Sequence, residues 1–163
     1  MKNQQTENDL QSGRNPQKDI IINKNGPIII IEDDEDDQEL LIEVFHKLNY
    51  QNKIHFLSDG EEAYNHITTS SEKPFLILSD INMPKLTGFA LRDKLKTDQK
   101  LNHKCIPYLF FSTARDQKAV IDAYSSSVQG FFKKQNNMPE LEKTISVIME
   151  YWRRCAAPND FPE

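Results

Sequence analysis

The sequence predicts an α/β fold, a doubly wound parallel sheet with helices on both faces. Three observations indicate it. Short apolar segments alternate with segments whose apolar residues recur at helical spacing, and the alternation occurs five times along the chain. Several of the short segments are apolar throughout, as parallel strands are when helices cover both faces of their sheet. The connections between segments are short, which favours right-handed crossovers between neighbouring parallel strands.

The strands are predicted from short runs that are rich in β-branched and aromatic residues. The first is Ile28–Ile31, a run of consecutive isoleucines that indicates a strand buried on both faces. The run at 75–78 reads Phe-Leu-Ile-Leu and is equally apolar. The remaining predicted strands are 53–57, 107–111 and 130–132.

A helical pattern follows each predicted strand, because apolar residues there recur every three or four positions. Asn137 and Glu140 stand at capping-box spacing just before the last of these patterns, which favours a helix start at that point. The predicted helices are 40–48, 60–67, 88–96, 116–124 and 141–152.

Five strands and five helices fit the flavodoxin-like strand order 2-1-3-4-5. The predicted domain spans residues 27–154. Residues 1–26 are polar and are expected to form a flexible tail, although the isoleucines at 20–22 leave an extra strand open as an alternative. Residues 155–163 contain two prolines and are expected to form a short carboxyl-terminal tail.

Composition excludes several classes of protein. The chain has 163 residues, of which 37% are hydrophobic, enough for one core without disulfide bonds. Its net charge of −5 argues against a nucleic-acid binder, which needs clustered cations. The apolar runs are too short to span a membrane, and the amino terminus lacks the apolar block of a signal peptide. The two separated cysteines, Cys105 and Cys155, suit a reduced interior, so we expect a cytoplasmic protein.

Acidic residues follow two predicted strands that are neighbours in this strand order. Glu32 and Asp33 come directly after the first strand, and Asp80 follows the third. Adjacent strands lie about 4.8 Å apart, so these carboxylates are expected to share one cation. Oxygen ligands of this kind favour Mg²⁺. The next acidic residues, 34–37, are interpreted as the solvated start of a helix.

The last two strand ends add a hydroxyl group and an ammonium group. Ser112 follows the fourth strand, and Lys133 and Lys134 follow the fifth. Taken singly, each fits a turn residue or a surface cation. Together with a bound cation they form a set that binds a phosphoryl group, and Asp80 is then the natural nucleophile, forming an aspartyl phosphate.

In this combination the chain resembles a response-regulator receiver domain of bacterial two-component signalling over residues 27–154. The resemblance rests on an acidic pair after the first strand, an Asp-x-x-Met-Pro-x-x-x-Gly run at 80–88, a serine after the fourth strand and a lysine after the fifth. It implies transfer of a phosphoryl group from the phosphohistidine of a sensor histidine kinase, or of a phosphotransfer protein, onto Asp80. It also implies a stand-alone switch in a phosphorelay, which catalyses only its own phosphorylation and dephosphorylation.

The resemblance also assigns roles to individual residues. Asp33 and Asp80 would bind Mg²⁺ directly, with the backbone carbonyl of Asn82 as a third ligand and Glu32 acting through water. The two remaining groups of the site, Ser112 and Lys134, would bind the phosphoryl oxygens. Phe131 would rotate when Ser112 moves, altering affinity for an unknown downstream protein. A homodimer through the face of the fourth or of the fifth helix is compatible with the family, whereas nucleic-acid and membrane partners are not expected.

Three positions depart from the family pattern. Gln135 stands where proline commonly follows the lysine, which leaves open whether Lys133 or Lys134 reaches the site. Asp34 is a further acid, which we interpret as a helix-start residue. Ala114 offers no polar group to orient a hydrolytic water, which predicts slow dephosphorylation.

Two other functions remain as alternatives. One is a receiver-like binding module that signals without phosphorylation. The other is a phosphohydrolase of the haloacid-dehalogenase type, which needs a second aspartate where Asn82 stands. The four histidines of the chain, His46, His55, His66 and His103, show no metal-ligand spacing along the sequence.

Overall fold

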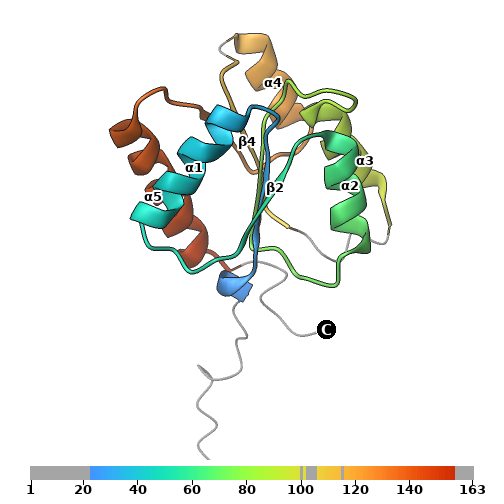
Figure 1. Ribbon diagram of the computed structural model, residues 1–163. Coiled ribbons are helices and arrows are strands. Elements are labelled where there is room, and N and C mark those ends of the chain that lie inside the picture. The colour runs from blue at the N-terminus through green and yellow to red at the C-terminus, as the bar shows by residue number, and fades with distance from the viewer. Residues whose placement is uncertain (1–22, 100, 102–105, 115, 157–163) are drawn as a thin grey trace, which may run out of the picture.

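The computed structural model describes residues 23–99, 101, 106–114 and 116–156, and within them a parallel five-stranded sheet is enclosed by helices (Figure 1). The strand order is β2-β1-β3-β4-β5, which confirms the predicted fold class. Every neighbouring pair of strands is parallel. The strands are β1 Ile28–Ile31, β2 Ile54–Leu57, β3 Leu76–Ser79, β4 Tyr108–Ser112 and β5 Gly130–Lys133.

Each α-helix of the domain begins after a residue whose side chain accepts a hydrogen bond from a backbone N–H of the first turn. These capping residues are Asp34, Asp59, Thr87, Asp116 and Asn137. The helices are α1 Glu35–Lys47, α2 Gly60–Thr69, α3 Gly88–Thr97, α4 Gln117–Ser125 and α5 Met138–Arg154. Helix α1 begins at Glu35, before the first apolar residue of its pattern at 40, because Asp34 caps it and acidic residues of the first turn suit its dipole, as expected for residues 34–37.

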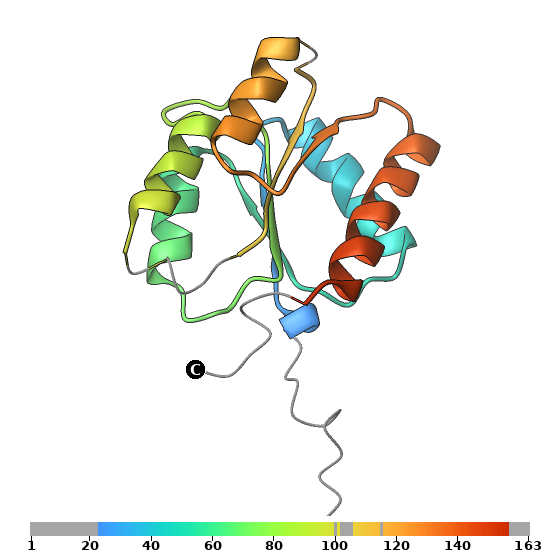
Figure 2. The same cartoon turned by 180° about the vertical axis from the view of Figure 1, so that it is seen from behind.

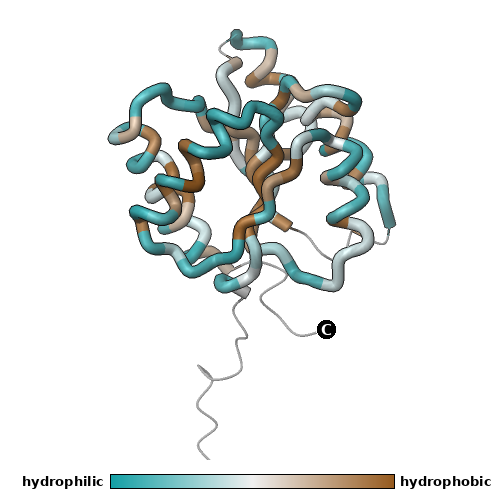
Figure 3. Tube along the Cα trace, viewed as in Figure 1, coloured by the Kyte–Doolittle hydropathy of each residue, from teal (hydrophilic) through white to brown (hydrophobic). Residues whose placement is uncertain are grey.

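The helices divide into two layers. Helices α1 and α5 cover one face of the sheet, and α2, α3 and α4 cover the other (Figures 1 and 2). Side chains alternate along each strand, so Ile28 and Ile30 pack towards α1 and α5 while Ile29 and Ile31 pack towards α2 and α3. The most hydrophobic stretches accordingly lie along the central strands, and hydrophilic stretches lie on the outer turns of the helices (Figure 3). In the described part of the chain no helix has the length and apolar character needed to cross a membrane.

The folded part extends further towards the amino terminus than the sequence predicts. Asn23–Asn25 form a 3-10 helix, although they were expected to belong to a flexible tail. The Lys24 ammonium group donates hydrogen bonds to the backbone oxygens of Trp152, at 3.0 Å, and Cys155. Asn52 donates to the backbone oxygens of Lys24 and Gly26, each at 2.8 Å. Contacts distant in sequence therefore fix this segment, while the possible strand at 20–22 and Cys105 lie outside the described residues.

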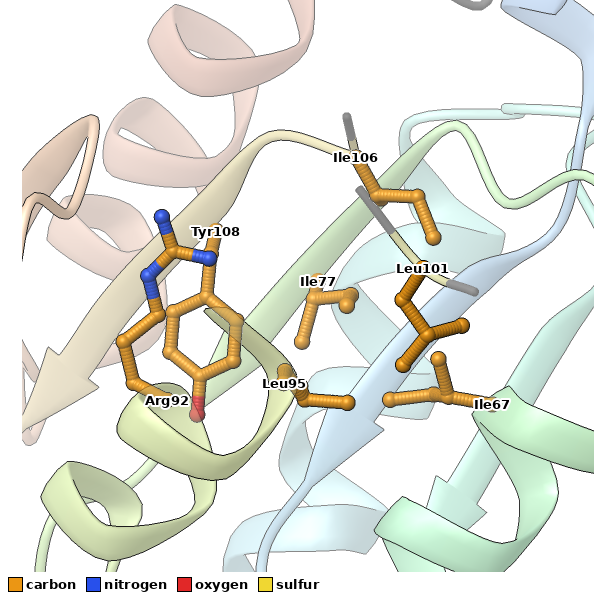
Figure 4. A pocket seen from close by; sticks show the side chains of 7 residues that line it. All are labelled: Ile67, Ile77, Arg92, Leu95, Leu101, Ile106 and Tyr108. Carbon is orange, nitrogen blue, oxygen red and sulfur yellow. The ribbon is translucent and has the colours of Figure 1, made fainter. Parts of the chain in front are cut away.

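A small pocket lies between α2, α3 and the starts of β3 and β4 (Figure 4). Its volume is about 40 Å³, enough for a few water molecules but far below the volume of a substrate site. The Arg92 guanidinium group lies over the Tyr108 ring at 5.4 Å from the ring centroid. The lining residues are Ile67, Ile77, Arg92, Leu95, Leu101, Ile106 and Tyr108.

Replacing Asp59 by Ala is expected to lower the free energy of unfolding by about 1 kcal/mol. The Asp59 carboxylate accepts hydrogen bonds from the backbone N–H groups of Glu61, at 3.0 Å, and Glu62, at 2.9 Å, and its other oxygen lies 2.7 Å from Lys85 Nζ. Urea unfolding followed by circular dichroism measures the change. Asn65→Ala, an exposed position on the same helix, is the control and should change stability much less.

The ion pair between Asp59 and Lys85 adds a pH dependence. The hydrogen bond from Lys85 lowers the pKa of Asp59 below its ordinary value of 3.8. Its contribution to stability is therefore fully present above pH 3.8 and is lost as the pH falls through the lower pKa of the folded state. Asp59→Asn keeps the cap but loses the pair, so its deficit relative to wild type should shrink below that pH. A deficit that stays constant with pH would contradict this.

Candidate functional site

The predicted site residues converge at the carboxyl ends of four strands. In the register of the sheet Ile31 lies opposite Ser79, and Ser112 lies opposite Lys133. The residues that follow each pair are therefore side by side. The Asp80 N–H donates to the Ile31 oxygen, and the Lys134 N–H donates to the Ser112 oxygen, each at 2.9 Å.

Three carboxylates meet at this edge. Oxygen atoms of Glu32, Asp33 and Asp80 all lie within 4.8 Å of one another. Glu32 and Asp80 are buried, with 2% and 8% of their surface exposed, whereas Asp33 is exposed. Carboxylates this close to one another repel unless a positive charge or a bound proton compensates their negative charge.

The Asp80 carboxylate is held by several donors. The Ser112 hydroxyl donates to Asp80 Oδ1 at 2.7 Å, and the Ile81 N–H donates to the same oxygen at 2.6 Å. The Asn82 N–H lies further away, at 3.4 Å. Ser112 itself is fully buried and accepts a hydrogen bond from the Ala114 N–H at 3.3 Å. Asp80 and Ser112 therefore have fixed positions relative to each other.

Lys134, rather than Lys133, supplies the ammonium group. Its Nζ contacts Glu32 Oε2 and lies 2.8 Å from Asp37 Oδ2 and 3.5 Å from Asp80 Oδ2. Lys133 is exposed, whereas Lys134 is buried. The described residues contain no cis peptide bond, so the bond between Lys134 and Gln135 is trans. The Lys134 side chain contacts the carboxylates with this trans bond following it.

Burial and pairing oppose each other at this lysine. Burial acts against the charged form, but hydrogen bonds to Asp37 and Glu32 outweigh it and raise the pKa of the Lys134 ammonium group. Burial also raises the pKa of the Glu32 carboxyl group, and the hydrogen bond from Lys134 offsets only part of that increase. Glu32 thus depends on Lys134 for its charged form.

Asp37 is a site contact that the sequence did not single out. We interpreted it as part of a solvated helix start, together with Glu35 and Asp36. All three do lie in the first turn of α1, but the Asp37 carboxylate bonds to Lys134. The indication available in the sequence was that Asp37 lies in the first helical turn after Glu32 and Asp33. Asp34 has the helix-start role that was predicted for it.

Gly88 allows α3 to begin directly against the Asp80 loop. A Cβ atom at position 88 would lie 2.2 Å from the Asp80 backbone oxygen and 2.8 Å from Phe110 Cε1. The Gly88 N–H donates to the Ile81 oxygen at 2.9 Å, which closes the loop. Lys85, inside the loop, has a φ of 62°, a left-handed conformation. The glycine is therefore required for the position of Asp80.

Phe131 lies beside a surface hollow. Its ring is partly buried, and its centroid is 6.4 Å from that of Phe110. The hollow has a volume of about 340 Å³ and lies where α4 meets β5. The residues that line it are Ala114, Val120, Tyr124, Phe131 and Lys133.

The residues at the acidic edge fit a hard divalent cation. The donors are oxygens only, and carboxylate oxygens are the ligands that Mg²⁺ and Mn²⁺ prefer. The exposed side of Asp33 and Asn82 leaves room for water ligands, which Mg²⁺ usually keeps.

Comparison with known proteins agrees with this geometry. The response regulator receiver domain model matches residues 28–146. The chain is 28% identical over 130 residues to response regulator Rcp1 of Synechocystis sp., covering 77% of this chain and 87% of that protein. It is 26% identical over 129 residues to the probable methanogenesis regulatory protein FilR2 of Methanothrix harundinacea, covering 77% and 82%.

Solved structures give the same result. The phosphorylated cyanobacterial phytochrome response regulator RcpA has a TM-score of 0.74 and 26% identity, covering 82% of this chain and 99% of that one. The Mn²⁺-bound form of response regulator Rcp1 has a TM-score of 0.71 and 26% identity, covering 85% and 99%. With its strand order, its acidic edge and these matches, the chain belongs to the response regulator receiver domain family.

Proposed function

We propose that this chain is a stand-alone receiver that accepts a phosphoryl group on Asp80 from the phosphohistidine of a sensor histidine kinase or phosphotransfer protein. The observation that carries the proposal is the position of the Asp80 carboxylate between the Ser112 hydroxyl and the Lys134 ammonium group, beside two further carboxylates. The similarity of this chain to response regulator Rcp1, over 87% of that protein, and to RcpA, over 99% of that chain, supports the proposal. The exchange would take place in the cytoplasm.

We propose that a divalent cation, Mg²⁺, is needed for this phosphoryl transfer. Asp33 and Asp80 would hold it, with the backbone carbonyl of Asn82 as a third ligand and Glu32 acting through water. When bound, it supplies positive charge that offsets the repulsion among the carboxylates and the incoming phosphoryl group. The Mn²⁺-bound form of Rcp1 supports a divalent cation in a related protein.

The residues of this chain supply the remaining steps. A carboxylate oxygen of Asp80 attacks phosphorus, the P–O bond forms, the P–N bond to histidine breaks, and the electron pair stays on the imidazole. Lys134 pairs with a phosphoryl oxygen, because its ammonium group already lies 3.5 Å from Asp80. The Ser112 hydroxyl, which donates to Asp80 before transfer, then donates to a phosphoryl oxygen.

The switch would follow from the movement of Ser112. Phosphorylation adds charge and acceptor oxygens at Asp80 and draws the hydroxyl towards them. Phe131, beside the hollow at α4 and β5, would then rotate inward and change the surface offered to a downstream protein or to a second copy of the chain.

The test is the intact mass of the protein after incubation with acetyl phosphate, with and without Mg²⁺. One Mg²⁺-dependent phosphoryl adduct is expected for wild type and for Asp93→Asn, an exposed aspartate on α3. Asp80→Asn should show none, with circular dichroism confirming that it is folded. An adduct on Asp80→Asn would refute the assignment. No adduct on wild type, even with kinase candidates, would favour the phosphorylation-independent binding module.

Ala114→Asn is expected to shorten the lifetime of the phosphorylated protein several-fold. The Ala114 N–H donates to Ser112 Oγ, so a polar side chain at 114 would lie near the acyl phosphate and orient a hydrolytic water. Loss of the adduct with time, followed by mass, measures the lifetime. Thr113→Asn, at the exposed neighbouring position, is the control. A wild-type half-life of seconds with Mg²⁺ would contradict the role given to Ala114.

A further inference from the structure

A second group of metal-ligating side chains lies apart from the acidic edge. Within the described residues, His55, His66 and Glu72 place one ligand atom each within 4.8 Å of one another. His55 Nε2 lies 2.8 Å from Glu72 Oε2, and the rings of His55 and His66 have centroids 4.7 Å apart. The histidines are separated in sequence without a metal-binding spacing, so only the fold brings them together.

Three different elements supply these side chains. His55 lies on β2, the edge strand, and faces α2, because its neighbours Ile54 and Phe56 pack on the opposite face of the sheet. His66 lies on α2, directly before the buried Ile67 that Figure 4 shows in the pocket wall. Glu72 lies in the loop from α2 to β3, where its N–H donates to Ser70 Oγ at 3.1 Å.

The chemistry of this group differs from that of the acidic edge. Two imidazoles and one carboxylate are the ligands of borderline divalent ions such as Zn²⁺, whereas Mg²⁺ prefers oxygen ligands only. A Zn²⁺ ion needs ligand atoms about 2.0–2.2 Å from its centre, so small side-chain rotations would close the observed spacing around it. All three residues are partly buried, which leaves a fourth position open to water.

We propose that His55, His66 and Glu72 form a Zn²⁺-type transition-metal site, separate from the phosphorylation site. Lys53 is its competitor, because Lys53 Nζ lies 3.2 Å from Glu72 Oε1 and occupies the carboxylate in the absence of an ion. A bound ion would join β2, α2 and the loop before β3. The ion would thereby raise the free energy of unfolding. At Zn²⁺ concentrations above the dissociation constant, this increase would grow with the logarithm of the Zn²⁺ concentration.

Calorimetric titration with ZnCl₂ in excess Mg²⁺, which occupies the acidic edge, tests the site. Wild type is expected to bind one Zn²⁺. His66→Gln and Glu72→Gln should bind it at least about tenfold more weakly, because changing even a hydrogen-bond partner of a ligand costs about that much. His46→Gln, an exposed histidine on α1, is the matched control and should bind as wild type does. Unchanged affinity in both ligand variants, or no uptake by wild type, would overturn the proposal.

Two further measurements do not depend on removing a ligand. Lys53→Gln should bind Zn²⁺ more tightly, since its competitor for Glu72 is gone; weaker binding would contradict the site. Co²⁺ in place of Zn²⁺ should give the visible absorption of a four- or five-coordinate nitrogen and oxygen site. An intense near-ultraviolet band from cobalt–thiolate bonds would instead assign the ion to a cysteine and overturn the proposal. The His66→Gln variant should still be phosphorylated on Asp80. Failure of the Zn²⁺ site can therefore be told apart from failure of the proposed function.

Discussion

Replacing Lys134 by Met is expected to lower the free energy of unfolding by about 3–5 kcal/mol. The loss is large because Glu32, whose side chain is 3% exposed, loses the ammonium group on which its charged form depends, so it must stay charged without a partner or take up a proton. Asp37 and Asp80 lose the same partner. Urea unfolding at neutral pH measures the change. The variant is also expected to accept a phosphoryl group from acetyl phosphate much more slowly, because no ammonium group offsets the charge that arrives.

A double variant separates the lost pair from lost packing. Lys134→Met combined with Glu32→Gln removes the buried charge as well as its partner, and should recover a large part of the stability lost by Lys134→Met alone. Lys133→Met, at the exposed neighbouring position, should change stability by much less. If the double variant is less stable than Lys134→Met, the charge of Glu32 is not the source of the loss.

Gly88→Ala is expected to lower the free energy of unfolding by about 3 kcal/mol and to slow phosphorylation of Asp80. The added Cβ would lie 2.2 Å from the Asp80 backbone oxygen, so the loop that carries Asp80 must move. The hydrogen bond that the Ser112 hydroxyl donates to the Asp80 carboxylate would then lose its geometry. Unfolding in urea and the rate of adduct formation measure the two effects.

Gly130→Ala is the matched control for this substitution. The atoms nearest to a Cβ there belong to the side chains of Phe132, at 3.1 Å, and Leu109, at 3.3 Å, which can shift by a few tenths of an ångström. It should therefore cost much less than Gly88→Ala and leave phosphorylation close to wild type. Equal losses in the two variants would show that close approach to the Asp80 backbone is not what requires glycine at position 88.

The fold and the residues that converge at the acidic edge could be predicted because both depend on local pattern. A strand of isoleucines followed by Glu32 and Asp33, and a second apolar strand followed by Asp80, determine which side chains meet at one edge of a parallel sheet. Lys134 was the expected lysine, but the sequence left the choice against its neighbour Lys133 open. The structure places Lys133 at the exposed end of β5 and Lys134 directly after it, where it is buried.

What the sequence did not predict depends on contacts between distant elements. Asp37 bonds to Lys134 although its own neighbours indicate only a helix start. Lys24 is held by backbone oxygens at the end of α5, about which the polar composition around it says nothing. His55 and His66 approach each other only because the edge strand β2 packs beside α2. Each of these contacts requires the three-dimensional fold and leaves no periodic signal in the chain.

The short 3-10 helix before β1 has a practical consequence for handling the molecule. Asn25 is exposed and lies beyond the opposite end of β1 from Glu32, and the strand between them spans about 13 Å. The bonds from Lys24 and Asn52 hold this segment firmly against the domain. A surface tether attached at position 25 would therefore orient the molecule with its acidic edge outward, open to solution.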